Sequence, residues 1–353
     1  MSVLDDGGFP LDSLGLMDAM GGSAEAFDDA RRGARAVALP WRSGQFRSVC
    51  IAGMGGSAIA ADLVLGAWRE ALRVPAAAQR DYTIPGWVGP ETLMILSSYS
   101  GDTEETLTAA AQATEDLVPC VAITSGGKLG GRYRDMGVPV IDLPPGLQPR
   151  AALLRLLVPL VVTLDRVGVI PSADADLDDA RASVVRAVAE WGPDVPTERN
   201  PAKRLAFDLL DTVPVFWGAE ATAPMAQRFK GQVNENAKVP AYWGVVPEVN
   251  HNEICGFEGM GAFGSLCRLV FLRDPRQHRQ VGRRFTLTRR LVEPDVGGVI
   301  EIEARGETPL GRLVDLVMLA DYATLYLAAL RGVDPGPVEA IGRLKEMLTT
   351  ERA

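Results

Sequence analysis

Histidine and cysteine are scarce in this chain, whose 353 residues include two histidines and four cysteines. The cysteines share no C-x-x-C spacing, and two histidines are too few to complete a zinc cluster of the usual kinds. The cysteines are Cys50, Cys120, Cys255 and Cys267. We therefore expect no metal site, and we expect the cysteines to be small, reduced core residues of a cytoplasmic protein.

Positive charge and long apolar runs are lacking too. The 36 Lys and Arg residues are outnumbered by 45 Asp and Glu residues, for a net charge of −9. This balance argues against nucleic acid as a partner, because binding to a phosphate backbone depends on clustered Lys and Arg. The apolar run at 153–164 is interrupted by Arg155 and falls short of the roughly 18 residues of a membrane span. Residues 1–10 lack the basic and apolar blocks of a signal peptide, so neither nucleic acid nor a membrane is an expected partner.

Strand-like runs alternate with helical stretches along most of the chain. A length prior of roughly 150 residues per domain predicts two domains. Apolar runs of strand length fall at 49–52, 93–96, 118–123, 138–143, 213–218, 267–272 and 298–302, and helical stretches fall at 58–72, 104–116, 151–169, 223–238 and 309–330. This alternation predicts an α/β fold in which each domain is a parallel sheet with helices on both faces.

We expect four segments in order. Residues 1–44 form an N-terminal helical segment, and residues 45–165 form the first sheet domain with its phosphate-binding loops. Residues 166–200 form a helical linker, whose acidic, alanine-rich part at 171–194 reads as a helical hairpin or linker. Residues 201–353 form the second sheet domain, which closes with a short helix at 337–348 after the Asp-Pro break at 334–335. The shared order of elements in the two halves would fit an old duplication.

Hydroxyl groups bunch where the run at 93–96 gives way to a helix. The segment 98–103 reads Ser-Tyr-Ser-Gly-Asp-Thr and contains Ser98, Ser100 and Thr103. A helix start offers unpaired N–H groups and a partial positive charge to an anion. Because no Lys or Arg occupies this loop, a phosphate there would be bound by hydroxyls and backbone amides. The alternative is that Ser100, Asp102 and Thr103 simply cap the helix.

Glycine turns follow two other predicted strands. The segment 53–57 reads Gly-Met-Gly-Gly-Ser, and 125–128 reads Ser-Gly-Gly-Lys. Glycine lets backbone approach a ligand closely, and the carboxyl ends of parallel strands gather at one sheet edge, where ligands of open α/β folds bind. A dinucleotide fingerprint is incomplete here, because Ala58 replaces its last glycine and no acidic residue follows about 20 positions on. We therefore expect no nicotinamide cofactor.

The residues able to perform chemistry lie mainly in the second half. Glu235 stands between asparagines in the stretch 232–238, and His251 lies in a second polar stretch at 250–253. A lone helical Glu is usually exposed, but asparagine neither favours helix nor packs well, so its use on both sides of Glu235 suggests side chains aimed at a ligand. Arg150, at the head of an apolar helix, could equally cap local carbonyls, and Lys345 could be a surface residue.

Seven segments in this order resemble the bifunctional phosphoglucose/phosphomannose isomerase family, whose members carry two flavodoxin-like sugar-isomerase (SIS) domains. The resemblance runs from about Ser48 to Lys345. Its carriers are the segments 53–57, 98–103, 125–129, 149–151, 234–238, 251–253 and 344–345. Any one of these is weak evidence, whereas all seven in order are specific.

The resemblance implies a role for each matching residue. Ser57, Ser98, Ser100 and Thr103 would hold the sugar phosphate, and Gly55 and Gly56 would let the backbone come close. Glu235 would be the base that carries a proton between C1 and C2, with Arg150 as the cation beside the cis-enediolate. His251 and Lys345 would open the sugar ring. The family is typically a homodimer in which the histidine reaches the neighbour's site.

The implied reaction interconverts glucose 6-phosphate and mannose 6-phosphate with fructose 6-phosphate. It needs a carboxylate base, a cation for the developing oxyanion and a ring-opening acid/base, and no step requires a metal or a redox cofactor. Two alternatives stay open: a noncatalytic sugar-phosphate sensor built from SIS modules, and the isomerase half of an amidotransferase. The sensor would have no reason to keep Glu235, His251 and Lys345 together, and the amidotransferase needs an N-terminal cysteine where Ser2 follows Met1.

Overall fold

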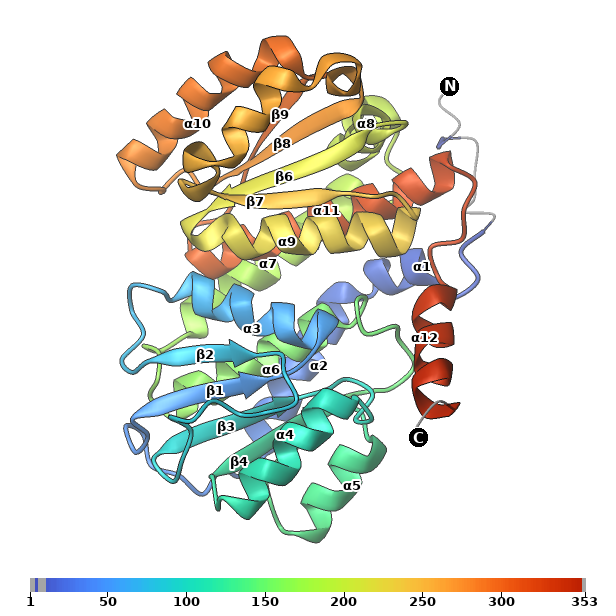
Figure 1. Cartoon of the computed structure of the whole chain (residues 1–353). Coiled ribbons are helices and arrows are strands. Elements are labelled where there is room, and N and C mark those ends of the chain that lie inside the picture. Colours follow the sequence, from blue (N-terminus) through green and yellow to red (C-terminus); the bar gives the residue numbers. More distant parts are fainter. Residues whose placement is uncertain (1–3, 6–10, 351–353) are drawn as a thin grey trace.

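Two parallel sheets lie one above the other with helices between them in the computed structural model, which describes residues 4–5 and 11–350 (Figure 1). The first sheet has the order β2-β1-β3-β4-β5 and the second the order β7-β6-β8-β9, with every neighbouring pair parallel. The strands are β1 (Ser48–Ala52), β2 (Ala76–Gln79), β3 (Thr92–Ser97), β4 (Cys120–Thr124), β5 (Val140–Asp142), β6 (Val213–Ala219), β7 (Tyr242–Val246), β8 (Cys267–Arg273) and β9 (Val299–Glu303). The first order is that of flavodoxin-like folds, and the predicted α/β class with two parallel sheets is confirmed.

Helices cover both faces of each sheet, as predicted. They are α1 (Leu16–Gly21), α2 (Ser23–Ala36), α3 (Gly55–Ala67), α4 (Glu104–Glu115), α5 (Gly127–Asp135), α6 (Leu153–Arg166), α7 (Asp174–Trp191), α8 (Pro201–Leu209), α9 (Ala223–Gln232), α10 (Arg279–Val292), α11 (Pro309–Leu330) and α12 (Glu339–Thr350). Alternate strand residues face opposite ways. Cys50 and Met94 therefore pack with α4 and α5, whereas Val49 and Ile95 join the larger core that runs between the sheets.

Helix α11 is the centre of that larger core. It begins where Thr308 Oγ1 accepts a hydrogen bond from Gly311 N at 3.0 Å, with Pro309 in the first helical turn, a favourable start for a helix. By length and apolar composition it could cross a membrane, but 89% of the relevant window is buried inside the protein. The helix is therefore read as a core element, against which α7 and α8 pack.

Several sequence predictions differ from the structure in detail. The stretch 171–194 contains one continuous helix, α7, rather than a hairpin. The expected helix at 223–238 ends as α9 at Gln232, passes through a π-helical turn (Val233–Ala237) and stops at Lys238, whose φ of 58° is left-handed. The strands β2 and β7 were not predicted. Segment boundaries at 44, 165 and 200 stay a prediction, and residues 1–10, read as free of a signal peptide, lie outside the described residues except for Leu4 and Asp5.

Candidate functional site

Three loops interlock at the carboxyl edge of the first sheet, as the sequence predicted. The glycine turn after β1 meets the hydroxyl loop after β3, because Tyr99 N donates to Ser57 Oγ at 3.4 Å. The hydroxyl loop in turn meets the turn after β4, where Ser125 Oγ donates to Tyr99 O at 2.6 Å. At Gly101, which has a φ of +73°, a Cβ atom would lie 1.9 Å from Gly126 O. Only glycine fits there, so the loops hold one another in a fixed arrangement.

The hydroxyl groups at this edge use only part of their hydrogen-bonding capacity within the chain. Ser98 is buried; its Oγ donates to Thr103 Oγ1 at 3.0 Å and accepts from Gly101 N at 3.1 Å. Ser100 is exposed and accepts from Asp102 N at 3.2 Å. Thr103 is the N-cap residue of α4, but its side chain makes no capping hydrogen bond. The purely capping alternative is therefore wrong for Thr103, and no described hydrogen bond uses its O–H donor, which lies beside the first turn of α4.

The glycine turn also brings Arg150 to this edge. A Cβ atom on Gly56 would lie 2.7 Å from Pro149 O, so the absence of a side chain at Gly56 allows α3 to approach the chain around Arg150. The Arg150 side chain is buried. Its Nε donates to Asn236 Oδ1 at 2.8 Å and its Nη2 donates to Gly336 O at 2.8 Å and to Pro335 O. A buried guanidinium with this many partners is held in one orientation.

Arg150 faces Glu235. Its Nη1 lies 3.7 Å from Glu235 Oε2, and the Glu235 side chain is 36% exposed. Burial lowers the pKa of Arg150, and the charge of Glu235 opposes that shift. The structure thus brings together a fixed cation from the first half and a solvent-accessible carboxylate from the second half, two residues that the sequence singled out separately.

A buried polar network lies behind this pair. Asp321 on α11 accepts from Arg228 through both carboxylate oxygens, at 2.6 and 2.7 Å, and from Gln232 at 2.6 Å. Arg228 also donates to Arg150 O at 3.3 Å. Burial raises the pKa of Asp321, and Arg228 is the main opposing influence. Through its bonds to Arg228 and Gln232, the Asp321 side chain anchors α9 beneath Arg150 and Glu235.

A cleft of about 280 Å³ opens between α3 and α9 beside the Arg150–Glu235 pair. Its walls are Gly55, Gly56, Ile59, Arg80, Arg150, Gln227, Arg228, Lys230, Gly231, Gln232, Glu235 and Trp243. The sequence had not suggested Arg80, Gln227, Arg228, Lys230 or Trp243. Gln227 and Arg228 lie about two helical turns before Glu235, on the same face of the predicted helix, so helical periodicity could have found them. No signal marked Arg80, which follows the unpredicted β2.

A second cavity, of about 590 Å³, lies on the other side of Glu235 against the start of α12. Lys238, also in its wall, donates to Pro337 O at 2.6 Å and to Glu235 O. Burial lowers the pKa of Lys238, as does the charge of Arg150. Lys238 thereby links the end of the π-helical turn to the segment that directly precedes α12.

His251 and Lys345, the two residues predicted to open the sugar ring, do not belong to the walls that surround Glu235. His251 is exposed in the 3-10 turn (Glu248–His251) that follows β7, and Lys345 is exposed on α12. Neither lines either of the two cavities that Glu235 borders. Within the described residues, no group of three or more His, Cys, Asp and Glu side chains is arranged to hold a metal ion.

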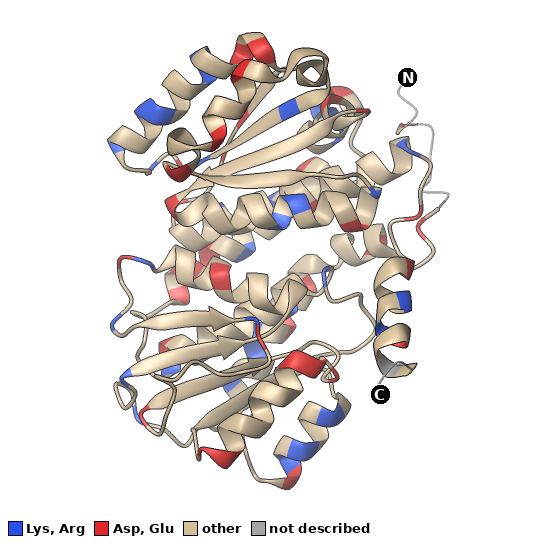
Figure 2. Cartoon of the chain, viewed as in Figure 1, with Lys and Arg blue, Asp and Glu red and all other residues tan. Residues whose placement is uncertain are grey.

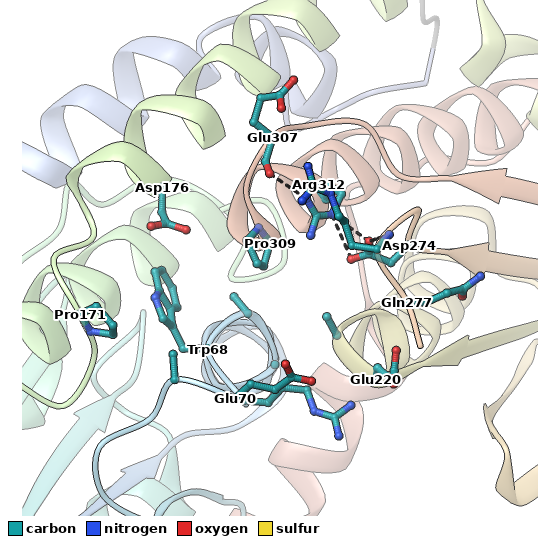
Figure 3. A pocket seen from close by; sticks show the side chains of 16 residues that line it. Trp68, Glu70, Pro171, Asp176, Glu220, Asp274, Gln277, Glu307, Pro309 and Arg312 are labelled. Atoms are coloured by element: carbon teal, nitrogen blue, oxygen red, sulfur yellow. Dashed lines mark hydrogen bonds and ion pairs between the residues drawn. The ribbon is translucent and has the colours of Figure 1, made fainter. Parts of the chain in front are cut away.

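The carboxyl edge of the second sheet forms a crevice of its own, of about 460 Å³ (Figure 3). Its wall carries the carboxylates of Glu70, Asp176, Glu220, Asp274 and Glu307. Arg312 is tied there to Asp274 and to Glu307 O. At the start of α11, Asp179 accepts from Glu307 N at 2.9 Å and from Thr308 N at 2.7 Å. An internal carboxylate thus holds the position that an anion would take, so the second half does not repeat the open, hydroxyl-lined edge of the first.

Basic and acidic side chains are interspersed over both halves (Figure 2). Helix α10 carries five cations, at Arg279, Arg283, Arg284, Arg289 and Arg290. Arg289 is ion-paired with Glu293 at 2.8 Å and with Glu301 at 3.1 Å. Part of the positive charge of α10 is therefore neutralised within the chain.

Comparison with known proteins matches this architecture to sugar-phosphate enzymes. Residues 198–348 match the family described as bacterial phospho-glucose isomerase C-terminal SIS domain. The chain is 40% identical over 301 residues to a protein of Caldicellulosiruptor bescii, covering 85% of this chain and 89% of that one, and 34% identical over 307 residues to one of Aquifex aeolicus, covering 86% and 91%. Both bear the name bifunctional phosphoglucose/phosphomannose isomerase. A hypothetical protein of Thermus thermophilus has the same fold, with a TM-score of 0.72, 18% identity and 97% and 91% coverage.

Proposed function

The chain belongs to the bifunctional phosphoglucose/phosphomannose isomerase family, and from that premise we propose that it interconverts glucose 6-phosphate and mannose 6-phosphate with fructose 6-phosphate. The observation that carries the proposal is the Arg150 guanidinium, buried and fixed 3.7 Å from the Glu235 carboxylate. A base beside an immobile cation is what proton abstraction next to a carbonyl requires.

In the proposed reaction, Glu235 removes the C2 proton of the open-chain aldose. The C–H electron pair forms the C1–C2 double bond, and the carbonyl electrons move to O1, which gives a cis-enediolate. Arg150 stabilises that oxyanion, and because its partners Asn236 and Gly336 hold it already, no reorganisation is needed as charge develops. A proton passes from O2 to O1, the electrons left on O2 form the C2 carbonyl, and the C1–C2 double-bond pair takes the proton from protonated Glu235 at C1, which yields the ketose. Return to either face of C2 in the reverse direction gives glucose or mannose stereochemistry.

The hydroxyl loop is proposed to hold the substrate's phosphate. Ser57, Ser98, Ser100 and Thr103 come from the two interlocked loops at the start of α3 and α4. Phosphate is stabilised there by hydroxyl donors and by the positive ends of the two helices. Gly55 and Gly56 line the adjoining cleft and leave room for the sugar.

Ring opening is assigned to His251 and Lys345 in a homodimer. Their exposure and their positions outside the cleft support a site completed by a second copy that supplies His251. Mixing inactive His251→Ala with inactive Glu235→Gln should then restore up to about a quarter of wild-type activity, because half of the chains would be in heterodimers with one intact site each. No recovery after demonstrated subunit exchange would place both residues in one chain's site. All four cysteines are free, which suits a cytoplasmic enzyme; Cys50, Cys120 and Cys267 are buried as expected, but the expected core position is wrong for Cys255, which is exposed.

Glu235→Gln tests the central role. The change keeps size and removes the base, so kcat should fall at least ~10²-fold while sugar-phosphate binding persists. Glu70→Gln is the matched control. Glu70 is exposed in the crevice at the carboxyl edge of the second sheet, and the same change there should leave kcat unaltered. Near-normal turnover in Glu235→Gln would remove Glu235 from this role.

A further inference from the structure

The active-site cleft contains more positive charge than the proposed reaction uses. Three guanidiniums of its wall each have a carboxylate partner: Arg150 has Glu235, Arg228 has Asp321, and Arg80 has Asp62. Lys230 also lines the cleft, and it takes part in no ion pair among the residues that the structure describes. The cleft therefore has a net positive wall even when Glu235 is ionised.

Arg80 reaches the cleft from an unexpected element. It directly follows β2, whose last residue pairs with Ala52, and Gly53 N donates to Gln79 O at 3.0 Å. Arg80 therefore lies beside the glycine turn, where Asp62 of α3 holds its guanidinium. Burial raises the pKa of Asp62, and Arg80 opposes that shift. One carboxylate occupies only part of a guanidinium's five donors, which leaves capacity for a ligand anion.

Lys230 reaches the same cleft from the second half of the chain. It lies on α9, which faces α3 across the cleft, and its side chain is partly buried. Trp243, 39% exposed on the edge strand β7, also borders the cleft. Arg80 and Lys230 thus belong to different halves of the molecule, and an anion between them would join the two.

We propose that Arg80 and Lys230 form a second phosphoryl-binding position, suited to the C1 phosphate of a hexose 1,6-bisphosphate. The inference rests on the proposed function. If the hydroxyl loop binds the C6 phosphate and Glu235 acts at C1 and C2, a substituent on C1 lies in the cleft that Glu235 shares with these cations. An aldose phosphorylated at C1 is an acetal whose ring cannot open, so it occupies the site without turnover and acts as a competitive inhibitor.

Calorimetric binding to the full chain tests this with two non-reacting ligands. Glucose 1,6-bisphosphate carries both phosphates, and 1,5-anhydroglucitol 6-phosphate carries only the C6 phosphate. Wild type should bind the bisphosphate more tightly. Lys230→Gln and Arg80→Gln should each weaken bisphosphate binding about tenfold, the order of one charge-assisted hydrogen bond, and weaken monophosphate binding less than twofold. Lys230→Arg should retain the affinity for the bisphosphate. Arg69→Gln removes the same charge in the crevice at the carboxyl edge of the second sheet, and it should change the affinity for neither ligand.

Two results would overturn the inference. Equal affinity of wild type for both ligands would mean that the cations hold no second phosphoryl group. Equal losses for both ligands in the variants would mean that Arg80 and Lys230 serve the C6 phosphate instead. Since both ligands are measured by binding, a wild-type chain that binds them but fails to isomerise fructose 6-phosphate would refute the proposed function alone.

Discussion

Replacing Arg150 by lysine separates the charge of this side chain from its shape. The guanidinium serves Asn236 through Nε, two backbone carbonyls through Nη2 and Glu235 through Nη1. An ammonium group sits at one point and cannot reach acceptors on opposite sides of that fork. We expect at least one buried hydrogen bond to a charged donor to be lost, at ~1.5–3 kcal/mol each in the free energy of unfolding. The same displacement of the cation from the reacting oxygen should lower kcat by ~10²-fold.

The assay is fructose 6-phosphate isomerisation coupled to a glucose 6-phosphate dehydrogenase, with urea unfolding of the same samples. Arg150→Gln, which removes the charge as well, should lose up to ~10³-fold in kcat. Arg155→Lys is the matched control. Arg155 lies just over one helical turn after Arg150 and makes a single described hydrogen bond, to Pro144 O at 3.0 Å. Full kcat in Arg150→Lys would refute the argument that the fork geometry matters, and equal losses in both Arg150 variants would show that lysine preserves nothing.

Three further changes probe the surrounding structure. Ser100→Ala together with Thr103→Ala should mainly raise KM, because phosphate contacts form in ground and transition state alike; an unchanged KM with an intact fold would limit these side chains to a structural role. Asp321→Leu leaves Arg228 buried without its counter-ion and should lower the free energy of unfolding by ~3–5 kcal/mol, whereas a loss below ~1 kcal/mol in urea unfolding would contradict the network. The hydrogen bond from Arg181 lowers the pKa of Asp28 in the folded chain. The pair therefore stabilises the fold fully above the unfolded pKa of about 3.9, and this stabilisation is lost as pH falls from there through the lower folded pKa. Asp28→Asn should make the free energy of unfolding depend less on pH in this range, and an unchanged pH dependence would show that the pair contributes nothing.

The sequence predicted elements where hydrophobic periodicity is strong and missed them where pairing decides. Helix α11 was predicted at its observed bounds because apolar residues predominate along its whole length. Strand β2 reads Ala-Ala-Ala-Gln, and alanine has little preference for strands, so only its pairing with β1 makes it a strand. The edge strand β7 was also missed, although it reads Tyr-Trp-Gly-Val-Val and all of its residues except the glycine favour strands. The π-helical turn depends on contacts of Val233–Ala237 with α11, which no local pattern records.

The sequence likewise predicted some residues of the candidate site and missed those that depend on pairing and packing. Loops that follow predicted strands could be placed at one sheet edge from topology alone, and Glu235 stood out by its neighbours in the chain. Arg80 depended on β2, and Asp321 meets Arg228 across 93 positions of sequence, so neither could be assigned to the site. Arg150 was noted, but its burial and its distance from Glu235 required the packing of both halves.

The most direct test of the central claim is to incubate the purified, chelator-treated chain with fructose 6-phosphate and to identify the sugar phosphates formed. We expect glucose 6-phosphate and mannose 6-phosphate both to appear, and we expect the Glu235→Gln variant to form neither at a comparable rate. A folded wild-type chain that forms no aldose phosphate, or that forms one only when a metal ion is returned, would contradict the central claim.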